Sequence, residues 1–324
     1  MIYIAYVVVA SLVVWLSVKA SQYIDLIDQK TSLSGAFLGG VLLSAVTSLP
    51  EMFTSISATI LIDKPSLCIG NILGSDLFNL TILGVLIPCY ARSFARTRTS
   101  RGHLWVCFYL FLSYVVLLLN MLDLVDFHIW TLNISTLLIL GLYILSVRHL
   151  AAENGPQPEA VAVEESDDDG DGDVDGLSLR QIVVRFVLVS LGIICLSVVL
   201  TYITDDIAVR LNLGAGLAGA IFLGVATSLP EVSSTIALFR IGNYNIGVGN
   251  IIGSNIFNFF VLCCADLFSR MPVYDFADPK VVGLMMFGGI STLLMVCALL
   301  AKKRGLKVLC ALGTIACYIG FLLR

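Results

Sequence analysis

The residues of this chain most able to bind an ion are two glutamates that stand in one repeated motif. Thr47-Ser48-Leu49-Pro50-Glu51 recurs 180 residues later as Thr227-Ser228-Leu229-Pro230-Glu231. Each glutamate lies inside an apolar stretch, where an ionised carboxylate costs several kcal/mol unless something neutralises it. No Lys or Arg in either stretch is placed to do so. A protonated glutamate in a structural hydrogen bond explains one such residue; a matched pair favours cation binding.

Hydroxyl groups accompany each glutamate at helical spacing. Thr47 and Ser48 lie four and three residues before Glu51, so all three share one face of a helix. Thr227 and Ser228 repeat this spacing in the second motif. The side chains on each face therefore offer oxygen donors next to a carboxylate.

A proline directly precedes each glutamate. Pro50 and Pro230 have no backbone N–H, and their rings clash with the carbonyls of Val46 and Ala226. Carbonyl oxygens near each proline are therefore freed from the helix, although an ordinary kink would need the same residue. Together the motifs supply carboxylate, hydroxyl and carbonyl oxygens, which suit Ca²⁺ and Na⁺ better than zinc or copper.

A second repeated motif follows each glutamate and adds amides. The two copies, offset by 179 residues, are Gly70-Asn71-Ile72-Leu73-Gly74-Ser75 with Phe78-Asn79, and Gly249-Asn250-Ile251-Ile252-Gly253-Ser254 with Phe257-Asn258. Ser75 and Asn79 are four residues apart, as are Ser254 and Asn258, so each pair shares a helix face. The glycines Gly70, Gly74, Gly249 and Gly253 permit close helix approach or local unwinding.

Asp76, next to Ser75, is the one acidic residue in this second motif. It could add a third carboxylate to the site, or it could be a charge that faces a polar helix interface. Both interpretations stay open from the sequence.

The elements that must position these residues are membrane helices. Of the 324 residues 58% are hydrophobic and 13% charged, and the mean hydropathy is +0.96, whereas soluble domains carry about 25% charged residues. Apolar stretches near the ~20 residues that cross a bilayer recur along the chain. We predict an all-α polytopic protein with ten spans, near residues 2–20, 33–62, 66–90, 103–122, 129–148, 181–203, 213–239, 245–268, 281–301 and 306–323.

An acidic linker divides the spans into two sets of five. Residues 151–176 include ten acidic residues and no Lys or Arg, a composition that cannot bury enough apolar surface to fold. The predicted units are residues 1–150, the linker 151–179, and residues 180–324. Five spans separate equivalent helices, and because five is odd, the second unit runs through the membrane in the opposite sense. Inverted repeats of this kind are typical of secondary transporters.

Basic residues indicate the orientation, because they gather in cytoplasmic loops. With ten spans, one side of the membrane holds fourteen: Lys19, Lys30, Arg92, Arg96, Arg98, Arg101, Arg148, Arg180, Arg185, Arg240, Lys302, Lys303, Arg304 and Lys307. The other side holds five: Lys64, Arg210, Arg270, Lys280 and Arg324. This bias predicts both termini outside and the linker in the cytoplasm.

The charge of the site predicts how it would work. An empty pair of carboxylates carries about −2 and resists being sealed into a low dielectric. One Ca²⁺ cancels that charge, and two or three Na⁺ cancel or slightly exceed it. Loaded states should therefore cross more cheaply than the empty one, which is the condition for obligatory exchange. Replacement of one Ca²⁺ by three Na⁺ would move one net charge in each cycle.

At these residues the chain resembles the sodium/calcium exchanger family of the cation/calcium antiporter superfamily. The shared features are two alpha repeats, here Gly35–Gly84 and Gly216–Asp266, the ten-span layout and a central hydrophilic loop. The resemblance implies Ca²⁺/Na⁺ antiport without a cofactor, a nucleic acid or an obligatory protein partner, in a lipid membrane. It implies these ion ligands: Glu51, Glu231, Thr47, Ser48, Thr227, Ser228, Ser75, Asn79, Ser254 and Asn258, with backbone carbonyls from Ser44 and Gly224.

The likeness is to short bacterial-type exchangers, so the inner (plasma) membrane of a bacterium is the expected location. Potassium-dependent members carry Asp where this chain has Asn258, which makes potassium coupling less favoured. The Gly-Asn-Ala-x-Glu pattern of the proton-coupled branch does not occur at Glu51 or Glu231.

Three alternatives to sodium-coupled exchange differ in what they predict. A cation/proton exchanger would follow a pH gradient and ignore sodium. A passive cation channel would conduct downhill without a counter-ion, and the inverted repeat argues against it. An enzyme is not expected, because no nucleophile or acid/base constellation can be identified.

Overall fold

The computed structural model describes residues 1–30, 45, 47–95, 100–125, 127–129, 132–152 and 178–323. Helices dominate this part of the chain, and one antiparallel pair of two-residue strands joins two of them. The elements are α1 (Ile2–Lys30), α4 (Leu49–Ile60), α5 (Pro65–Cys89), α6 (Ala91–Phe94), α7 (Arg101–Met121), β1 (His128–Ile129), β2 (Leu132–Asn133), α8 (Ile134–Ala152), α9 (Leu179–Arg210), α10 (Ala215–Ala218), the π-helix η2 (Gly219–Leu223), α11 (Gly224–Thr227), α12 (Leu229–Arg240), α13 (Tyr244–Phe268), α14 (Pro279–Leu300) and α15 (Arg304–Leu323).

Seven of the described helices are long and apolar enough to cross a membrane. The bent pair formed by residues 215–227 and 229–240 makes up to eight, and Ile134–Leu150 is a shorter apolar helix. The predicted span at residues 33–62 lies partly outside the described residues, as does Ser44. The chain is an integral membrane protein, since apolar helices of this length are what a bilayer requires.

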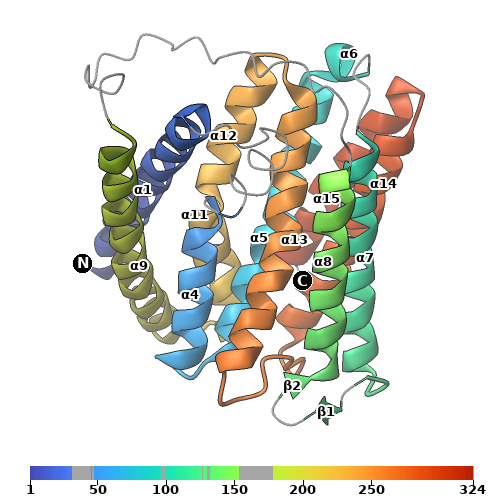
Figure 1. The fold of residues 1–324 in the computed structure, drawn as a ribbon. Helices are drawn as coiled ribbons and strands as arrows, with labels where there is room; N and C mark the ends of the chain where they lie inside the picture. The colour runs from blue at the N-terminus through green and yellow to red at the C-terminus, as the bar shows by residue number, and fades with distance from the viewer. Residues whose placement is uncertain are drawn as a thin grey trace.

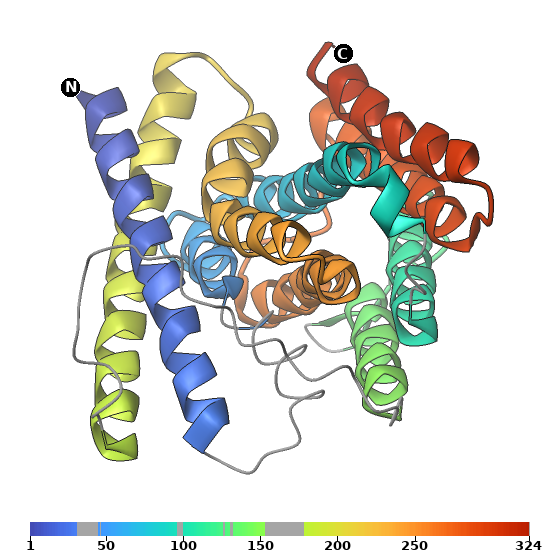
Figure 2. The same ribbon diagram turned by 90° about the horizontal axis from the view of Figure 1, so that it is seen from above.

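Two central helices are surrounded by more exposed ones. In α5 and α13, 72% of the most apolar window is buried, against 17% in α1 and α9. Figures 1 and 2 show α1 lying along α9 as a pair at one side of the molecule. The pairs α7 with α8 and α14 with α15 pack on the other side of α5 and α13. The second repeated motif, at residues 70–79 and 249–258, therefore lies on the two most deeply buried helices.

The two central helices run in opposite directions. In Figure 1, α5 rises to α6 at the top of the molecule, whereas α13 begins at the top, after α12, and descends toward β2. They contact each other, and each also contacts the helix that precedes it, α4 or α12. The two helices that carry the second motif thus pack antiparallel to each other at the centre of the molecule.

Glycines allow the backbone of α5 to touch the bent segment that contains α10 and η2. A Cβ atom on Gly70 would lie 2.1 Å from the carbonyl oxygen of Gly216, and one on Gly74 would lie 2.4 Å from Cα of Ala220. The predicted close approach is confirmed at these two glycines. A Cβ on Gly249 would instead meet a side chain, at 2.5 Å from Cε1 of His103.

Substitution of Gly70 by alanine should therefore destabilise the protein. The new methyl group would collide with backbone, which cannot rotate away, and overpacking of this kind costs about 1–3 kcal/mol. We expect a lower melting temperature of the detergent-purified protein. The matched control is Gly141→Ala in α8, where nothing lies within 4 Å of the added atom. Equal melting temperatures for the two variants would contradict this account.

Candidate ion-binding site

A break in the helix precedes each of the two glutamates. Ser48 has φ −89° and ψ 12°, and α4 begins at the next residue. Ser228 has φ −85° and ψ 0°, and α12 begins directly after it, bent by 45° from the preceding segment. Pro50 and Pro230 lie in the first turn of α4 and α12, where a missing N–H costs nothing. The sequence predicted freed carbonyls near the prolines; the structure places a full break at the serines.

The break puts each carboxylate at the start of a helix. Glu51 lies in the first turn of α4 and Glu231 in the first turn of α12. Free backbone N–H groups and the positive end of the helix dipole favour negative charge there, usually by 0.3–1 kcal/mol. That is much less than the cost of burying a charge, so the helix ends alone do not neutralise these side chains.

The two glutamates are linked by reciprocal hydrogen bonds. Ser48 Oγ donates to Oε1 of Glu231 at 3.0 Å, and Ser228 Oγ donates to Oε1 of Glu51 at 3.1 Å. Oε2 of each glutamate is buried and has no hydrogen-bond partner. The exposed fraction is 1% for Glu51 and 0% for Glu231. Two buried carboxylates thus each keep one oxygen free for something other than a hydrogen bond.

Electrostatic repulsion between the two carboxylates also favours a positive charge in the site. The carboxylates of Glu51 and Glu231 lie close enough for their charges to interact, and the side chains of Thr227 and Thr47 interact with them respectively. Among the described residues, the ion pairs Lys64–Asp205 and Arg210–Asp206 involve neither glutamate. A bound cation would relieve the repulsion and satisfy the free oxygens together, whereas a proton on one glutamate would relieve the repulsion alone.

The second motif contributes further free oxygens. Oδ1 of Asn79, Oδ1 of Asn258 and Oγ of Ser254 are buried without a hydrogen-bond partner. Ser75 Oγ donates to the backbone carbonyl of Gly224 at 3.1 Å, which joins α5 to α11. A buried amide oxygen without a partner is energetically costly, so it needs either a hydrogen-bond donor or a cation.

The structure brings most predicted site residues into this buried region. The following are all buried: Thr47, Ser48, Glu51, Ser75, Asn79, Gly224, Thr227, Ser228, Glu231, Ser254 and Asn258. Ser44 lies outside the described residues. Within the described part of the chain no three His, Cys, Asp or Glu side chains form a group that could hold a metal ion. The donors are two carboxylates with hydroxyl and amide oxygens, a set that fits Ca²⁺ or Na⁺.

Asn71 is a residue of this region to which sequence reasoning gave no role. Its Nδ2 donates to Thr54 Oγ1 at 3.0 Å, to Ser55 Oγ at 2.9 Å and to the carbonyl of Glu51 at 3.4 Å. It therefore ties α5 to the first turns of α4 and fixes the backbone of Glu51.

The same clamp exists in the second motif. Asn250 donates to three groups at 3.0, 3.0 and 3.4 Å: Ser234 Oγ, Thr235 Oγ1 and the carbonyl of Glu231. The signal was present in the sequence, because both asparagines belong to the repeated motif, but a helix pattern does not show which side chain reaches a neighbouring helix.

Asp76 differs from the two glutamates in that each oxygen of its carboxylate accepts a hydrogen bond. Asn258 Nδ2 donates to Oδ1 at 2.9 Å and the hydroxyl of Tyr114 donates to Oδ2 at 3.3 Å. It is 0% exposed. Both interpretations from the sequence find support here, because the residue lies at a polar helix interface and also contacts a predicted ligand.

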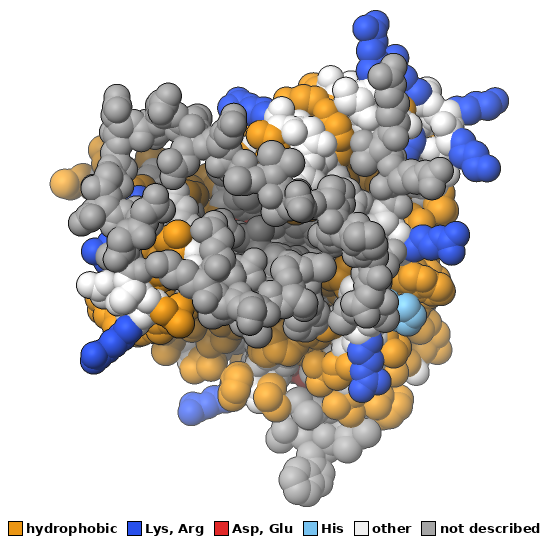
Figure 3. Space-filling view, turned by 45° about the horizontal axis from the view of Figure 1, so that its top comes forward, with side chains coloured by type: hydrophobic (Ala, Val, Ile, Leu, Met, Phe, Trp, Pro, Cys, Tyr) orange, Lys and Arg blue, Asp and Glu red, His pale blue; other side chains and the backbone are white. Residues whose placement is uncertain are grey.

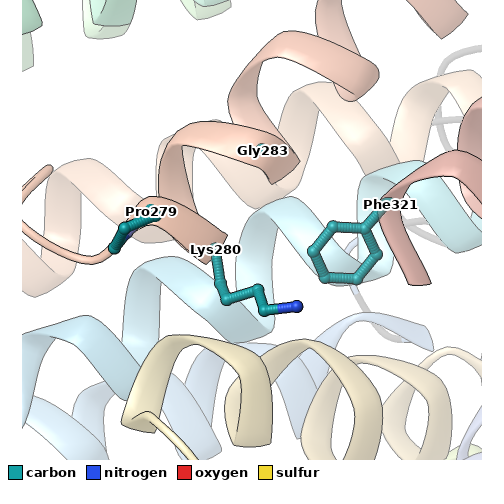
Figure 4. A pocket seen from close by; sticks show the side chains of 4 residues that line it. All are labelled: Pro279, Lys280, Gly283 and Phe321. Carbon is teal, nitrogen blue, oxygen red and sulfur yellow. The ribbon is translucent and has the colours of Figure 1, made fainter. Parts of the chain in front are cut away.

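A small surface pocket lies away from this region. Figure 4 shows it between α14 and α15, lined by Pro279, Lys280, Gly283 and Phe321. Its one charged lining residue is a lysine, so this pocket does not suit a cation.

Comparison with protein families gives one match that covers nearly the whole chain. The family model described as "Sodium/calcium exchanger protein" matches residues 2–151 and 181–324. The interval that it omits is the acidic linker predicted from composition.

Individual relatives match in part. The inner membrane protein YrbG of Escherichia coli (strain K12) is 27% identical over 240 residues, which cover 69% of this chain and 66% of that protein. The sodium/potassium/calcium exchanger 1 of Homo sapiens is 36% identical over 89 residues, which cover 26% of this chain and 8% of that protein. The chain thus spans less than two thirds of the length of each.

Two solved structures share the fold along the chain. The sodium-calcium exchanger NCX_Mj has a TM-score of 0.61 at 21% identity and 99% coverage of both chains. The H⁺/Ca²⁺ exchanger CAX has a TM-score of 0.72 at 14% identity, with 99% of this chain and 81% of that chain covered.

Proposed function

Because the chain belongs to the sodium/calcium exchanger protein family, we propose that it is a secondary antiporter that exchanges Ca²⁺ for Na⁺ across a membrane. Membership in a family of exchangers makes it a transporter of cations rather than an enzyme. The proposal includes the coupling ion, the ion ligands and the membrane topology.

One observation carries the proposal above the others. Glu51 and Glu231 are buried side by side, each accepts a hydrogen bond from the serine of the other motif, and each keeps one oxygen without a partner. A structural pair of carboxylates would satisfy both oxygens with donors from the protein. The proposed ligands are the two glutamates with the hydroxyl, amide and carbonyl oxygens of Thr47, Ser48, Thr227, Ser228, Ser75, Asn79, Ser254, Asn258, Ser44 and Gly224.

The proposed architecture is ten membrane spans in two inverted halves, residues 1–150 and 180–324, joined by a cytoplasmic linker at 151–179. Supporting it are the motif offsets of 180 and 179 residues, the opposite directions of α5 and α13, and the matched hydrogen bonds on the two sides of the site. Two halves related in this way can rock against each other and open the site to one side of the membrane at a time.

Charge determines which states can make that transition. The glutamate pair carries about −2 when empty, and closing an uncompensated charge into a low dielectric is costly. A bound Ca²⁺, or two to three Na⁺, removes this cost, so exchange is coupled and leakage is suppressed. If three Na⁺ balance one Ca²⁺, transport is electrogenic, and each cycle gains about 2.3 kcal/mol per 100 mV.

The distribution of basic side chains supports an orientation. Figure 3 shows Lys and Arg around the rim of the end of the molecule that carries α6. Arg92 in α6, Arg101 at the start of α7, Arg240 at the end of α12 and Arg304 at the start of α15 belong to this end. By the positive-inside rule it faces the cytoplasm, with both termini opposite. The bacterial inner membrane is the proposed location, in keeping with the name of the E. coli relative.

The proposal is tested by uptake of ⁴⁵Ca²⁺ into proteoliposomes. Vesicles with the purified protein are loaded with Na⁺, K⁺ or choline and diluted into sodium-free buffer with ⁴⁵Ca²⁺. We expect rapid uptake with internal Na⁺ alone. If three Na⁺ leave for each Ca²⁺ that enters, one positive charge leaves in each cycle, so uptake should be faster when valinomycin and external K⁺ make the interior positive. Uptake that is the same for all three internal cations would reject sodium coupling.

Cation/proton exchange is the second candidate, because the chain shares its fold with the H⁺/Ca²⁺ exchanger CAX as well as with the sodium-calcium exchanger NCX_Mj. It shares the glutamate pair but not the coupling ion. An added arm with choline inside and an imposed pH gradient separates the two: uptake driven by the pH gradient, and indifferent to Na⁺, would establish proton exchange instead.

A further inference from the structure

A chain of buried polar contacts between α5 and α13 has Asp76 at its centre. Oδ1 of Asp76 accepts a hydrogen bond from Asn258 Nδ2 at 2.9 Å, and its backbone carbonyl accepts one from Asn255 Nδ2 at 3.0 Å. Oδ1 of Asn255 in turn accepts a hydrogen bond from Asn79 Nδ2 at 2.9 Å. Asp76 therefore contacts one predicted ion ligand directly and the other through a single asparagine.

The contacts on the two helices correspond to each other. Asn255 occupies the position of Asp76 in the second motif, 179 residues later, and Asn258 likewise corresponds to Asn79. Asp76 accepts a hydrogen bond from Nδ2 of Asn258, and Asn255 accepts one from Nδ2 of Asn79, in each case from the opposite helix. The arrangement is the same on both sides, but only one side carries an acid.

These contacts determine which end of each amide is free. An amide has a donor end and an acceptor end, and a carboxylate can only accept. When the nitrogen of Asn258 faces Asp76, its oxygen must point elsewhere, and Oδ1 of both Asn258 and Asn79 is indeed buried without a partner. Groups behind a ligand commonly fix its orientation and raise its affinity in this way.

The carboxylate does more than an asparagine could do at that position. Tyr114 donates to its second oxygen at 3.3 Å, so each oxygen of this carboxylate already accepts a hydrogen bond from the protein. Asp76, Glu51 and Glu231 also do not form a three-acid group that could hold a metal, within the described part of the chain. When ionised, Asp76 would place a negative charge directly behind Asn258, at hydrogen-bond distance from its amide.

We propose that Asp76 is a positioning residue that turns the amide oxygen of Asn258 toward the transported ions and makes the α13 half of the site more attractive to cations than the α5 half. This inference rests on the proposed function, because it assumes that Asn258 is an ion ligand.

The decisive variant is Asp76→Asn, which keeps an oxygen to accept from Asn258 and removes the charge. The energy between a fixed charge and an ion is proportional to the charge of the ion. The fold-change in affinity for Ca²⁺ should therefore be about the square of that for one Na⁺: if Na⁺ affinity falls about tenfold, Ca²⁺ affinity should fall about 100-fold. Equilibrium ⁴⁵Ca²⁺ binding to the full chain in detergent, and its displacement by Na⁺, measures both. Unchanged affinities, or an equal loss for the two ions, would overturn the assignment.

Two further variants separate charge from orientation. Asp76→Leu removes the acceptor as well, and should weaken Ca²⁺ binding by about another tenfold or more. Tyr114→Phe removes one hydrogen bond from Asp76 but neither the charge nor the contact with Asn258, and should stay within about threefold of wild type. Asp76→Leu equal to Asp76→Asn would refute the orienting role. If Asp76→Leu does not fold, as judged by its melting transition, Asp76→Asn still decides the role of the charge.

The result cannot be confused with a failure of the proposed function. A wild-type protein that neither binds ⁴⁵Ca²⁺ nor exchanges it for Na⁺ refutes the function itself. A wild-type protein that does both, with Asp76→Asn indistinguishable from it, refutes the role of Asp76 alone.

Discussion

Glu51→Gln is expected to reduce Na⁺-driven ⁴⁵Ca²⁺ uptake by at least about 100-fold, and Glu231→Gln to do the same. Removing one partner of a buried charged group costs about 3–5 kcal/mol, and each 1.4 kcal/mol is a factor of ten in affinity. Both variants should show a loss of at least this size, because each glutamate accepts a hydrogen bond from the serine of the opposite motif and each keeps one free oxygen. Initial uptake rates at saturating internal Na⁺ measure the effect.

The control for these variants is Asp206→Asn. Asp206 also loses a carboxylate, but it lies 45% exposed in an ion pair with Arg210 at 2.9 Å, away from the glutamates. Exposed pairs contribute about 0–1 kcal/mol, so transport should remain near wild type. If either glutamine variant retains full uptake and Ca²⁺ binding, the glutamate pair is not the transport site.

The second large effect is expected from Asn71→Leu, which should lower the rate of exchange by about 10- to 100-fold, as loss of a group that orients a ligand commonly does. The leucine cannot donate to Thr54, Ser55 or the carbonyl of Glu51, so α4 is no longer tied to α5 at the carboxylate. A weakened clamp should act on Ca²⁺ affinity more than on the amount of folded protein. Binding and uptake are therefore measured on monodisperse protein of the same yield.

The matched control here is Asn120→Leu. Asn120 is buried and also donates two hydrogen bonds, to Asn133 Oδ1 at 3.1 Å and Ser135 Oγ at 3.0 Å, near the junction of α7 and α8. It should lower stability without a selective loss of Ca²⁺ affinity. Equal losses of affinity in the two variants would mean that Asn71 acts only through general stability.

The two asparagine clamps also indicate how the halves of the site are built. Each clamp joins neighbouring helices of one motif, whereas the serine–glutamate and aspartate–asparagine contacts join the two motifs to each other. The contacts that join the two copies surround the proposed ion site, so they are the ones that would respond to a change of the ion between them.

The sequence alone predicts the class of this protein and the pair of residues at its candidate ion-binding site. Apolar stretches of membrane length fixed the class, because a bilayer admits few other structures. The recurrence of Thr-Ser-Leu-Pro-Glu identified Glu51 and Glu231 as the pair of interest, since a carboxylate in an apolar span needs a reason to be there. Helical spacing predicted Thr47 and Ser48 on the face of Glu51, but the helix breaks at Ser48 and the hydroxyl of Ser48 donates to Glu231 instead.

Contacts between helices were decided only by the tertiary structure. Periodicity along one helix cannot show that Ser48 donates to Glu231 and not to Glu51, which is nearer in the sequence. It also cannot show that Asn71 reaches α4, or that both oxygens of Asp76 accept hydrogen bonds. Those outcomes depend on how close α5 comes to its neighbours, which small residues such as Gly70 permit but do not dictate. Local spacing fixes which side chains share a face, and packing selects what each face meets.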